Sequence, residues 1–196
     1  MAMQLSDLDF NKTYSYADYY SWTFDERVEL INGRLFHLYS PGTEHQRLSG
    51  RISVSFYNYL KGKPFEVFTA PFDIRFPVES RNDEGIFTVV QPDISVICDR
   101  SKIDERGCLG APDIVIEILI AGNNRKELQD KFDLYQNSGV KEYWIIHSVS
   151  KTFFKYTLQE GHYVPSRLLT FGDIVTTPIL PGYVLNLDKL FGDRDY

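Results

Sequence analysis

The sequence predicts an α/β fold: a mixed β-sheet core flanked by helices, with an N-terminal hairpin and a C-terminal β-ribbon. Near-continuous runs of Val, Ile and Leu, such as residues 113–120, are typical of strands that are covered on both faces. A strand at 113–120, a helix at 125–138 and a strand at 141–147 follow one another with short connections, which indicates a right-handed parallel crossover.

Length and composition indicate one folded domain. The chain has 196 residues, of which 43% are hydrophobic and 15% aromatic. We expect a single domain over 1–196, with a lead-in at 1–12, a core at about 25–150 and a C-terminal β extension at about 151–196. No apolar run approaches the ~20 residues that span a bilayer, and the N-terminus lacks a signal-peptide pattern. We therefore expect a cytoplasmic protein without membrane contact.

Charge and cysteine content narrow the function. A net charge of −6 weighs against the broad basic face of a strong nucleic-acid binder. A nuclease is still compatible with this charge, because a bound cation offsets acidic ligands. Local lysines and arginines can also contact the phosphate backbone of a nucleic acid. Cys98 and Cys108 form no metal-ligand spacing with any histidine, and Cys98 is most simply a small buried hydrophobe. No Gly-rich phosphate loop indicates a nucleotide cofactor.

The N-terminal half contains clear local signals. Ser15 is a candidate N-cap for a short aromatic helix at 16–22. Asn32-Gly33 between apolar runs predicts a type I′ hairpin of 28–31 and 34–38. The next helix is expected from residue 43 to Gly62, with Thr43 and Gln46 forming a capping box. Its apolar residues recur at helical spacing: Leu48, Ile52, Phe56 and Tyr59 or Leu60.

The remaining elements are predicted from apolar runs and turns. Strands are expected at 65–76 and 87–98, separated by a polar loop at 79–85. Gly139 ends the crossover helix. A β-ribbon at 152–169 turns through Glu160-Gly161, and a tail follows that ends around residues 180–182.

Two carboxylates are the strongest candidates for chemistry. Asp93 follows Pro92 inside a strand-like run, and Glu117 lies among Ile114, Val115, Ile116 and Ile118. A buried carboxylate has a large desolvation cost unless a cation or donor compensates it, so a divalent-metal site for phosphodiester hydrolysis is indicated. The alternative for Asp93 is a turn at the entry to a strand, a purely structural role that we also assign to the second Pro-Asp dipeptide, Pro112-Asp113. The alternative for Glu117 is a buried ion pair with an arginine.

Lys131 is a candidate because of its place on the crossover helix. At about 100° per residue, Leu128, Phe132, Leu134 and Tyr135 define the inward face, and Lys131 falls inside that arc. Its ammonium then points into the site or extends to the surface. An ordinary i,i+4 pair with Glu127 is the alternative, and periodicity does not choose between the two.

Two N-terminal residues are weaker candidates. Glu29 lies on the hairpin and faces away from Leu30, toward solvent or a cleft. His45 opens a helix, where a histidine is usually exposed.

Several stretches together resemble the Uma-type putative restriction endonucleases, which belong to the PD-(D/E)XK nuclease superfamily. The resemblance runs from about Tyr16 to Phe191, and the ensemble is specific although no single motif is. It implies a restriction-endonuclease-like fold. The matching stretches are residues 110–119, Lys131 with Tyr135, residues 139–146, residues 43–46 and residues 180–183.

The resemblance also implies roles for individual residues. Asp93 and Glu117 match the metal ligands, and Lys131 matches a lysine displaced onto the helix from the usual position, which is Leu119 here. Glu29 and His45, the latter together with Gln46, match the N-terminal acidic and His-Gln positions. The chain departs from the family at residues 120–122, where Ile-Ala-Gly replaces Ser-Pro-Ser, and at Glu127, where the family has aspartate.

These observations predict a metal-dependent endonuclease that hydrolyses phosphodiester bonds of nucleic acid, in the first place DNA. Oxygen ligands without a cysteine or histidine cluster suit Mg²⁺ or Mn²⁺. The alternatives are a nuclease fold kept as a binding module with a degraded site, and a hydrolase of small phosphate esters. The high aromatic content further predicts a homodimer, with Phe153, Phe154 and Tyr156 on a candidate interface.

Overall fold

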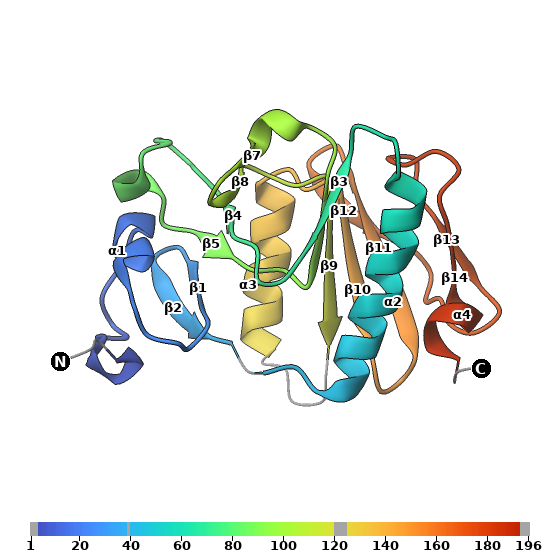
Figure 1. Ribbon diagram of the computed structural model, residues 1–196, viewed down its shortest axis with the longest axis horizontal. Coiled ribbons are helices and arrows are strands. Elements are labelled where there is room, and N and C mark those ends of the chain that lie inside the picture. Colours follow the sequence, from blue (N-terminus) through green and yellow to red (C-terminus); the bar gives the residue numbers. More distant parts are fainter. Residues whose placement is uncertain (1–3, 39, 120–124, 193–196) are drawn as a thin grey trace.

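The computed structural model describes residues 4–38, 40–119 and 125–192, with side chains from residue 128 onward in the last range. Two six-stranded sheets form most of the molecule, and Figure 1 shows the first toward the N-terminal end and the second toward the C-terminal end. The first sheet has the order β2-β1-β5-β4-β8-β7. Its strands are β1 (Val28–Ile31), β2 (Arg34–His37), β4 (Ile74–Arg75), β5 (Val89–Val90), β7 (Ile103–Asp104) and β8 (Gly107–Leu109).

The second sheet has the order β12-β11-β10-β9-β6-β3 and is mixed. Its central strands β9 and β10 are parallel, and its other pairs are antiparallel. Its strands are β3 (Glu66–Thr69), β6 (Ile94–Ile97), β9 (Ile114–Leu119), β10 (Glu142–His147), β11 (Thr152–Gln159) and β12 (His162–Pro165). A small pair, β13 (Ile174–Thr176) and β14 (Val184–Asn186), completes the strands.

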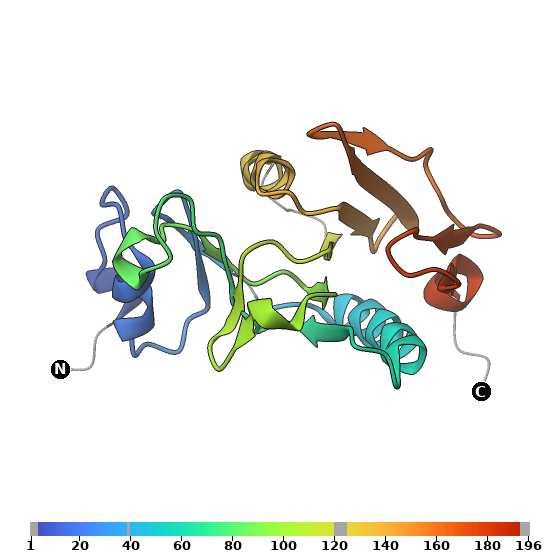
Figure 2. The same cartoon turned by 90° about the horizontal axis from the view of Figure 1, so that it is seen from above.

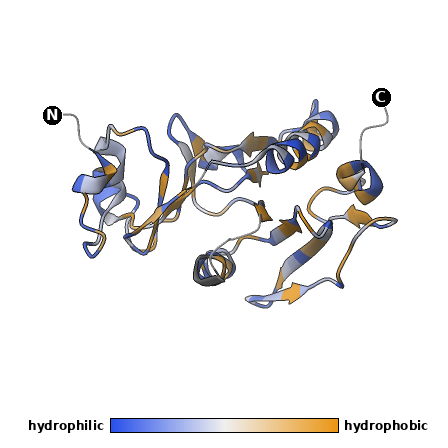
Figure 3. Cartoon of the chain, turned by 90° about the horizontal axis from the view of Figure 1, so that it is seen from below, coloured by the Kyte–Doolittle hydropathy of each residue, from blue (hydrophilic) through white to orange (hydrophobic). Residues whose placement is uncertain are grey.

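Helices cover both faces of the second sheet. Figure 2 shows α2 (Thr43–Leu60) on one face and α3 (Arg125–Asn137) on the other. Figure 3 shows that hydrophobic residues are concentrated in the strands, whereas hydrophilic residues are prominent on the helices. The remaining helices are α1 (Tyr16–Ser21), α4 (Leu187–Phe191) and the short 3₁₀ segments η1 (Leu5–Asp7), η2 (Asp83–Gly85) and η3 (Arg100–Lys102).

The alternation of side chains along β9 decides which residues reach the site. Ile114, Ile116 and Ile118 pack with the apolar face of α2, whereas Val115 packs with Tyr135 of α3. Successive side chains of a strand point to opposite faces. Glu117 therefore lies on the same face as Val115, the face that α3 covers.

Most locally encoded elements are confirmed. Ser15 caps α1, and its side chain accepts a hydrogen bond from the amide of Asp18. Asn32 and Gly33 both have positive φ, 52° and 73°, as the type I′ turn between β1 and β2 requires. The parallel crossover β9-α3-β10 and the ribbon β11-β12 are also present. The mixed α/β architecture with an N-terminal hairpin and a C-terminal ribbon is thus confirmed.

Four expectations about elements are wrong. The runs 65–76 and 87–98 are not single strands, because the chain leaves the second sheet for the first between β3 and β4, and returns between β5 and β6. Pro71 and Pro92 lie in these breaks, and proline has no amide to donate to a ladder. Thr43 forms no capping box, because Gly42 is the N-cap of α2. The tail continues past residue 182 into β14 and α4, and β7 and β8 were not expected.

Two smaller expectations can be compared with the structure. Cys98 is half-buried and Cys108 is buried, and both are free thiols whose pKa burial raises to about 12. Within the described ranges, no helix has the length and apolar character to cross a membrane.

Candidate active site

Asp93 directly precedes β6, and Glu117 lies on the neighbouring strand β9. The antiparallel register of β6 and β9 pairs Ile94 with Ile116, so its continuation by one residue brings Asp93 opposite Glu117. Directly opposite residues of an antiparallel pair share a face. Asp93 is also tied to β9, because its Oδ2 accepts a hydrogen bond of 2.7 Å from the amide of Ile118. The two carboxylates therefore lie on one side of the sheet.

Lys131 of α3 points into this site and not to the surface. Its Nζ lies 3.0 Å from Oε1 of Glu117 and 3.0 Å from Oε2 of Glu29. Only 4% of Lys131 is exposed, so its ammonium depends on these carboxylates in place of water. The side chain of the alternative partner, Glu127, lies outside the described part of the structure. Residues 120–122, where the chain departs from the family pattern, also lie outside the described residues.

Glu29 of β1 is completely buried and faces the site. It receives two donors, the ammonium of Lys131 and the backbone amide of Gln91, which is 2.7 Å from its Oε1. The first sheet thus contributes an acid to a site that otherwise belongs to the second sheet, α2 and α3.

Gln91 is a residue that the sequence did not single out. Its side-chain oxygen accepts from both Nε and Nη2 of Arg27, at 2.9 and 2.7 Å. Its side-chain nitrogen donates to Asp73 at 2.9 Å and to the hydroxyl of Tyr19 at 3.0 Å. Because both ends of its side-chain amide and its backbone amide are engaged, Gln91 is fixed between Glu29 and the Pro92-Asp93 turn.

His45 is buried, contrary to the expectation that a histidine at a helix start is exposed. Its Nε2 lies 3.0 Å from Oδ1 of Asp93. Burial lowers the pKa of His45, but the hydrogen bond to Asp93 and the charges of Asp93 and Glu117 outweigh it and raise the pKa above its ordinary value. The contact with Asp93 thus favours the protonated imidazole.

Tyr135 completes the site, and its role was also missed. Its hydroxyl donates a hydrogen bond of 2.9 Å to the Oε1 of Glu117 that Lys131 also contacts. Tyr135 follows Lys131 by four residues, so the two side chains lie on one face of α3. That spacing, and the resemblance that already paired Tyr135 with Lys131, were the signals in the sequence that connected Tyr135 to the site.

The site carries surplus negative charge. Asp93, Glu117 and Glu29 supply three carboxylates, and Lys131 supplies one ammonium. Burial raises the pKa of Glu117 to about 7; Lys131 opposes this shift, and the charges of Asp93 and Glu29 add to it. Burial likewise acts against the charged form of Lys131, but Glu117 and Glu29 hold its pKa well above the usual value.

The donor set fits a hard divalent cation held by few protein ligands. Across the described parts of the chain, no three His, Cys, Asp or Glu side chains form a group that could hold a metal ion. Mg²⁺ is usually bound by only one or two carboxylates and takes its other ligands from water and substrate phosphates. Asp93 and Glu117 are such a pair, and a divalent cation would offset the surplus charge around them.

The structure therefore brings all five candidates, Asp93, Glu117, Lys131, Glu29 and His45, into one cluster. Their catalytic and metal-binding roles stay predictions. The fold and this cluster are those expected of a restriction-endonuclease-like protein.

Comparison with known proteins identifies the family. The family model Uma2, described as a putative restriction endonuclease, matches residues 16–188, and the chain belongs to this family. The crystal structure of a putative nuclease of the DUF820 group from Anabaena variabilis ATCC 29413 has the same fold. The TM-score is 0.70 at 20% sequence identity, over 91% of this chain and 97% of that one. No curated protein sequence matches the chain significantly.

Proposed function

We propose that this protein is an endonuclease that hydrolyses phosphodiester bonds of nucleic acid, specifically DNA, with Mg²⁺ or Mn²⁺ as its cofactor. The observation that carries the proposal is the buried cluster in which Asp93 and Glu117 oppose each other beside Lys131. Membership of a putative restriction endonuclease family supports the same reaction class.

Asp93 and Glu117 would hold the cation. When bound, it would polarise a phosphate oxygen and lower the pKa of an attacking water. The backbone amide of Ile118 fixes Asp93, and Tyr135 fixes Glu117, so the two carboxylates are oriented before any ligand arrives. Such preorganisation avoids the cost of ordering the side chains during the reaction.

Lys131 would stabilise negative charge that develops on the phosphate. Its high pKa keeps the ammonium charged throughout the physiological range. Glu29 positions that ammonium from the opposite side, and Gln91 in turn positions Glu29. His45 acts on Asp93, where it orients one carboxylate oxygen and adds a positive charge when protonated.

Plasmid, linear and single-stranded nucleic acids, incubated with Mg²⁺ or Mn²⁺, provide the test. We expect wild type to cleave at least one of them and Glu117→Ala to be inactive. Glu79→Ala is the matched control, because Glu79 is exposed and lies outside the cluster. A Glu117→Ala variant that cleaves as fast as wild type would overturn the assignment. If wild type cleaves nothing with any metal, the chain is better described as a nuclease-fold binding module.

Four further properties belong to this proposal. We propose that residues 1–196 form one domain, that the protein is a homodimer, and that it acts in the cytoplasm on DNA in preference to RNA. Light scattering at high concentration tests the homodimer, and a monomer mass would end that part of the proposal. Parallel cleavage assays on DNA and RNA of one sequence test the substrate.

A further inference from the structure

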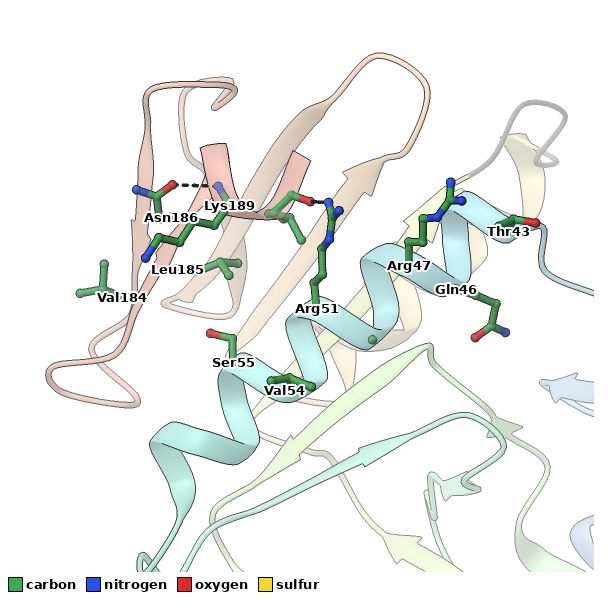
Figure 4. Close-up of a pocket in the computed structure, with 12 residues that line it drawn as sticks. Thr43, Gln46, Arg47, Arg51, Val54, Ser55, Val184, Leu185, Asn186 and Lys189 are labelled. Carbon is green, nitrogen blue, oxygen red and sulfur yellow. Dashed lines mark hydrogen bonds between the residues drawn. The ribbon is translucent and has the colours of Figure 1, made fainter. Parts of the chain in front are cut away.

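A large groove lies beside α2, apart from the buried cluster. Its volume is about 1090 Å³, and it runs between the outer side of α2 and the C-terminal segment of β14 and α4 (Figure 4). Its lining includes Gln46, Arg47, Arg51 and Val54 of α2, and Val184 and Lys189 of the C-terminal segment.

The charge of this groove is opposite to that of the chain. Its lining includes Arg47, Arg51 and Lys189 but no Asp or Glu, although the protein has a net charge of −6. In Figure 4 the three cations follow one another along the groove, from Lys189 on α4 through Arg51 to Arg47 near the start of α2. A row of cations without acids fits a polyanion.

Nearby acids offset these charges only in part. Glu44 pairs with Arg47 at 3.4 Å, but the same carboxylate is also bound by Lys151. Asp188, beside Lys189, keeps its charge, and its Oδ1 accepts a hydrogen bond of 2.7 Å from the amide of Gly172. Arg51 has a structural task within the described part of the chain, because it donates to the carbonyls of Leu190 and Gly192 and so joins α4 to α2.

The groove and the candidate active site each take a residue from the first turn of α2. Gln46 lines the groove, and the preceding residue, His45, contacts Asp93. An acidic protein segment would match the cations of the groove as well. Nucleic acid is the polyanion that the proposed function takes as its substrate, and it is therefore the occupant we argue for.

We propose that this groove binds the sugar-phosphate backbone of a nucleic-acid strand. Arg47 and Lys189 contact phosphates, and the exposed apolar side chains of Val54 and Val184 contact the sugars between them. The inference rests on the proposed function, because it takes nucleic acid to be the substrate.

The test measures binding separately from cleavage. Fluorescently labelled duplex and single-stranded DNA are titrated with the full-length protein in a metal chelator, over a range of salt concentrations. For the double variant Arg47→Gln/Lys189→Gln, we expect dissociation constants to rise on the order of tenfold at low salt. The slope of log affinity against log salt should fall in magnitude by about 1.8 for duplex or about 1.4 for single strand, the value for two lost phosphate contacts.

The matched control is Lys61→Gln/Lys63→Gln. It makes the same change of charge at the C-terminal end of α2, outside the groove. We expect this variant to bind with the wild-type slope. Equal losses in both double variants would show general electrostatic attraction and overturn the proposal. The wild type could instead bind poly-glutamate more tightly than DNA, and only the groove variant could lose this binding. That result would assign the groove to an acidic protein segment and would also overturn the proposal.

This design separates the groove from the chemistry. If wild type binds DNA through the groove but cleaves nothing in Mg²⁺ or Mn²⁺, the groove assignment stands and the nuclease proposal fails. If wild type cleaves and the groove variant binds and cleaves with unchanged KM, the nuclease proposal stands and the groove assignment fails.

Discussion

Asp93 and Asp113 occupy equivalent positions on the paired strands β6 and β9. Each follows a proline and directly precedes its strand. Oδ2 of Asp93 accepts the amide of Ile118 at 2.7 Å, and Oδ2 of Asp113 accepts the amide of Cys98 at 2.7 Å. Each aspartate thus joins the start of its own strand to the end of the other.

The two aspartates differ in what faces the second oxygen. Oδ1 of Asp93 meets His45 at 3.0 Å in a site rich in carboxylates. Oδ1 of Asp113 meets Lys141 at 2.6 Å. Burial tends to raise the pKa of Asp113, but Lys141, the amide of Cys98 and Lys102 outweigh it and lower that pKa below its usual value. Both Pro-Asp dipeptides make the same contact with a backbone amide. The neighbouring side chains decide whether the negative charge of the aspartate is neutralised, as at Asp113, or is available to a ligand, as at Asp93.

The largest expected effect is a difference in cleavage rate between variants of the two aspartates. We predict that Asp93→Asn lowers the cleavage rate by at least ~10³, because amide oxygens bind divalent cations more weakly and the charge balance of the site is lost. Asp113→Asn should cleave within a few fold of wild type. Initial rates at saturating Mn²⁺ measure both. Equal losses would mean that Asp93 also acts only through the backbone.

The next effect compares the two lysines. Lys131→Met leaves Glu29 and Glu117 buried without a cation, which should cost about 3–5 kcal/mol in the free energy of unfolding. Lys141 is 63% exposed in its side chain, but its partner Asp113 is buried and then keeps the amide of Cys98 as a donor, so Lys141→Met should cost less, about 1–3 kcal/mol. Urea unfolding measures both.

Lys131→Met should also lower the cleavage rate of the folded fraction by ~10²–10³. Lys141→Met should leave that rate unchanged. If Lys131→Met cleaves as well as wild type, the lysine is a structural partner of the two glutamates and not a catalytic group.

A smaller effect concerns the stability that Asp113 provides. Asp113→Asn should lower the free energy of unfolding by about 1–3 kcal/mol at neutral pH. The pKa of Asp113 is lowered in the folded state, so its contribution is present above the unfolded value of 3.8 and is lost as pH falls through the folded pKa. The difference in stability between wild type and variant should therefore shrink as the pH falls below 3.8. If denaturant titrations show the same difference at neutral pH and well below pH 3.8, the charge-based account is wrong.

The smallest effect concerns the tyrosines beside Glu117. Tyr135 donates to the charged form of Glu117, so Tyr135→Phe should raise the pKa of that carboxyl. Cleavage requires the carboxylate, so its rise with pH should move to higher pH by about one unit or less. Tyr143→Phe is the control, because the buried hydroxyl of Tyr143 has no hydrogen-bond partner among the described residues. Equal shifts in both pH–rate profiles would refute a specific role for Tyr135.

Local signals predicted much of the fold. The cap at Ser15, the Asn32-Gly33 turn and the β9-α3-β10 crossover each depend on residues close together in sequence. The division of residues 65–76 and 87–98 between two sheets depends on pairing with distant strands. Apolar patterning is the same in either sheet, so periodicity could not reveal the division.

The candidate site followed a similar rule. Asp93, Glu117 and Lys131 were recognisable because charged residues in apolar surroundings are unusual. The burial of His45 and the contact of Gln91 with Glu29, 62 residues away in sequence, arise only when α2 and the first sheet pack against the second. Such contacts leave no local pattern.

Mn²⁺ binding to the protein without nucleic acid tests the difference between the two aspartates most directly. We predict that wild type and Asp113→Asn bind Mn²⁺ alike in isothermal titration calorimetry, because their carboxylate clusters are identical. Asp93→Asn should bind at least tenfold more weakly, about 1.4 kcal/mol or more. Equal binding by all three proteins, or weaker binding by Asp113→Asn alone, would contradict the assignment of Asp93 as the metal ligand.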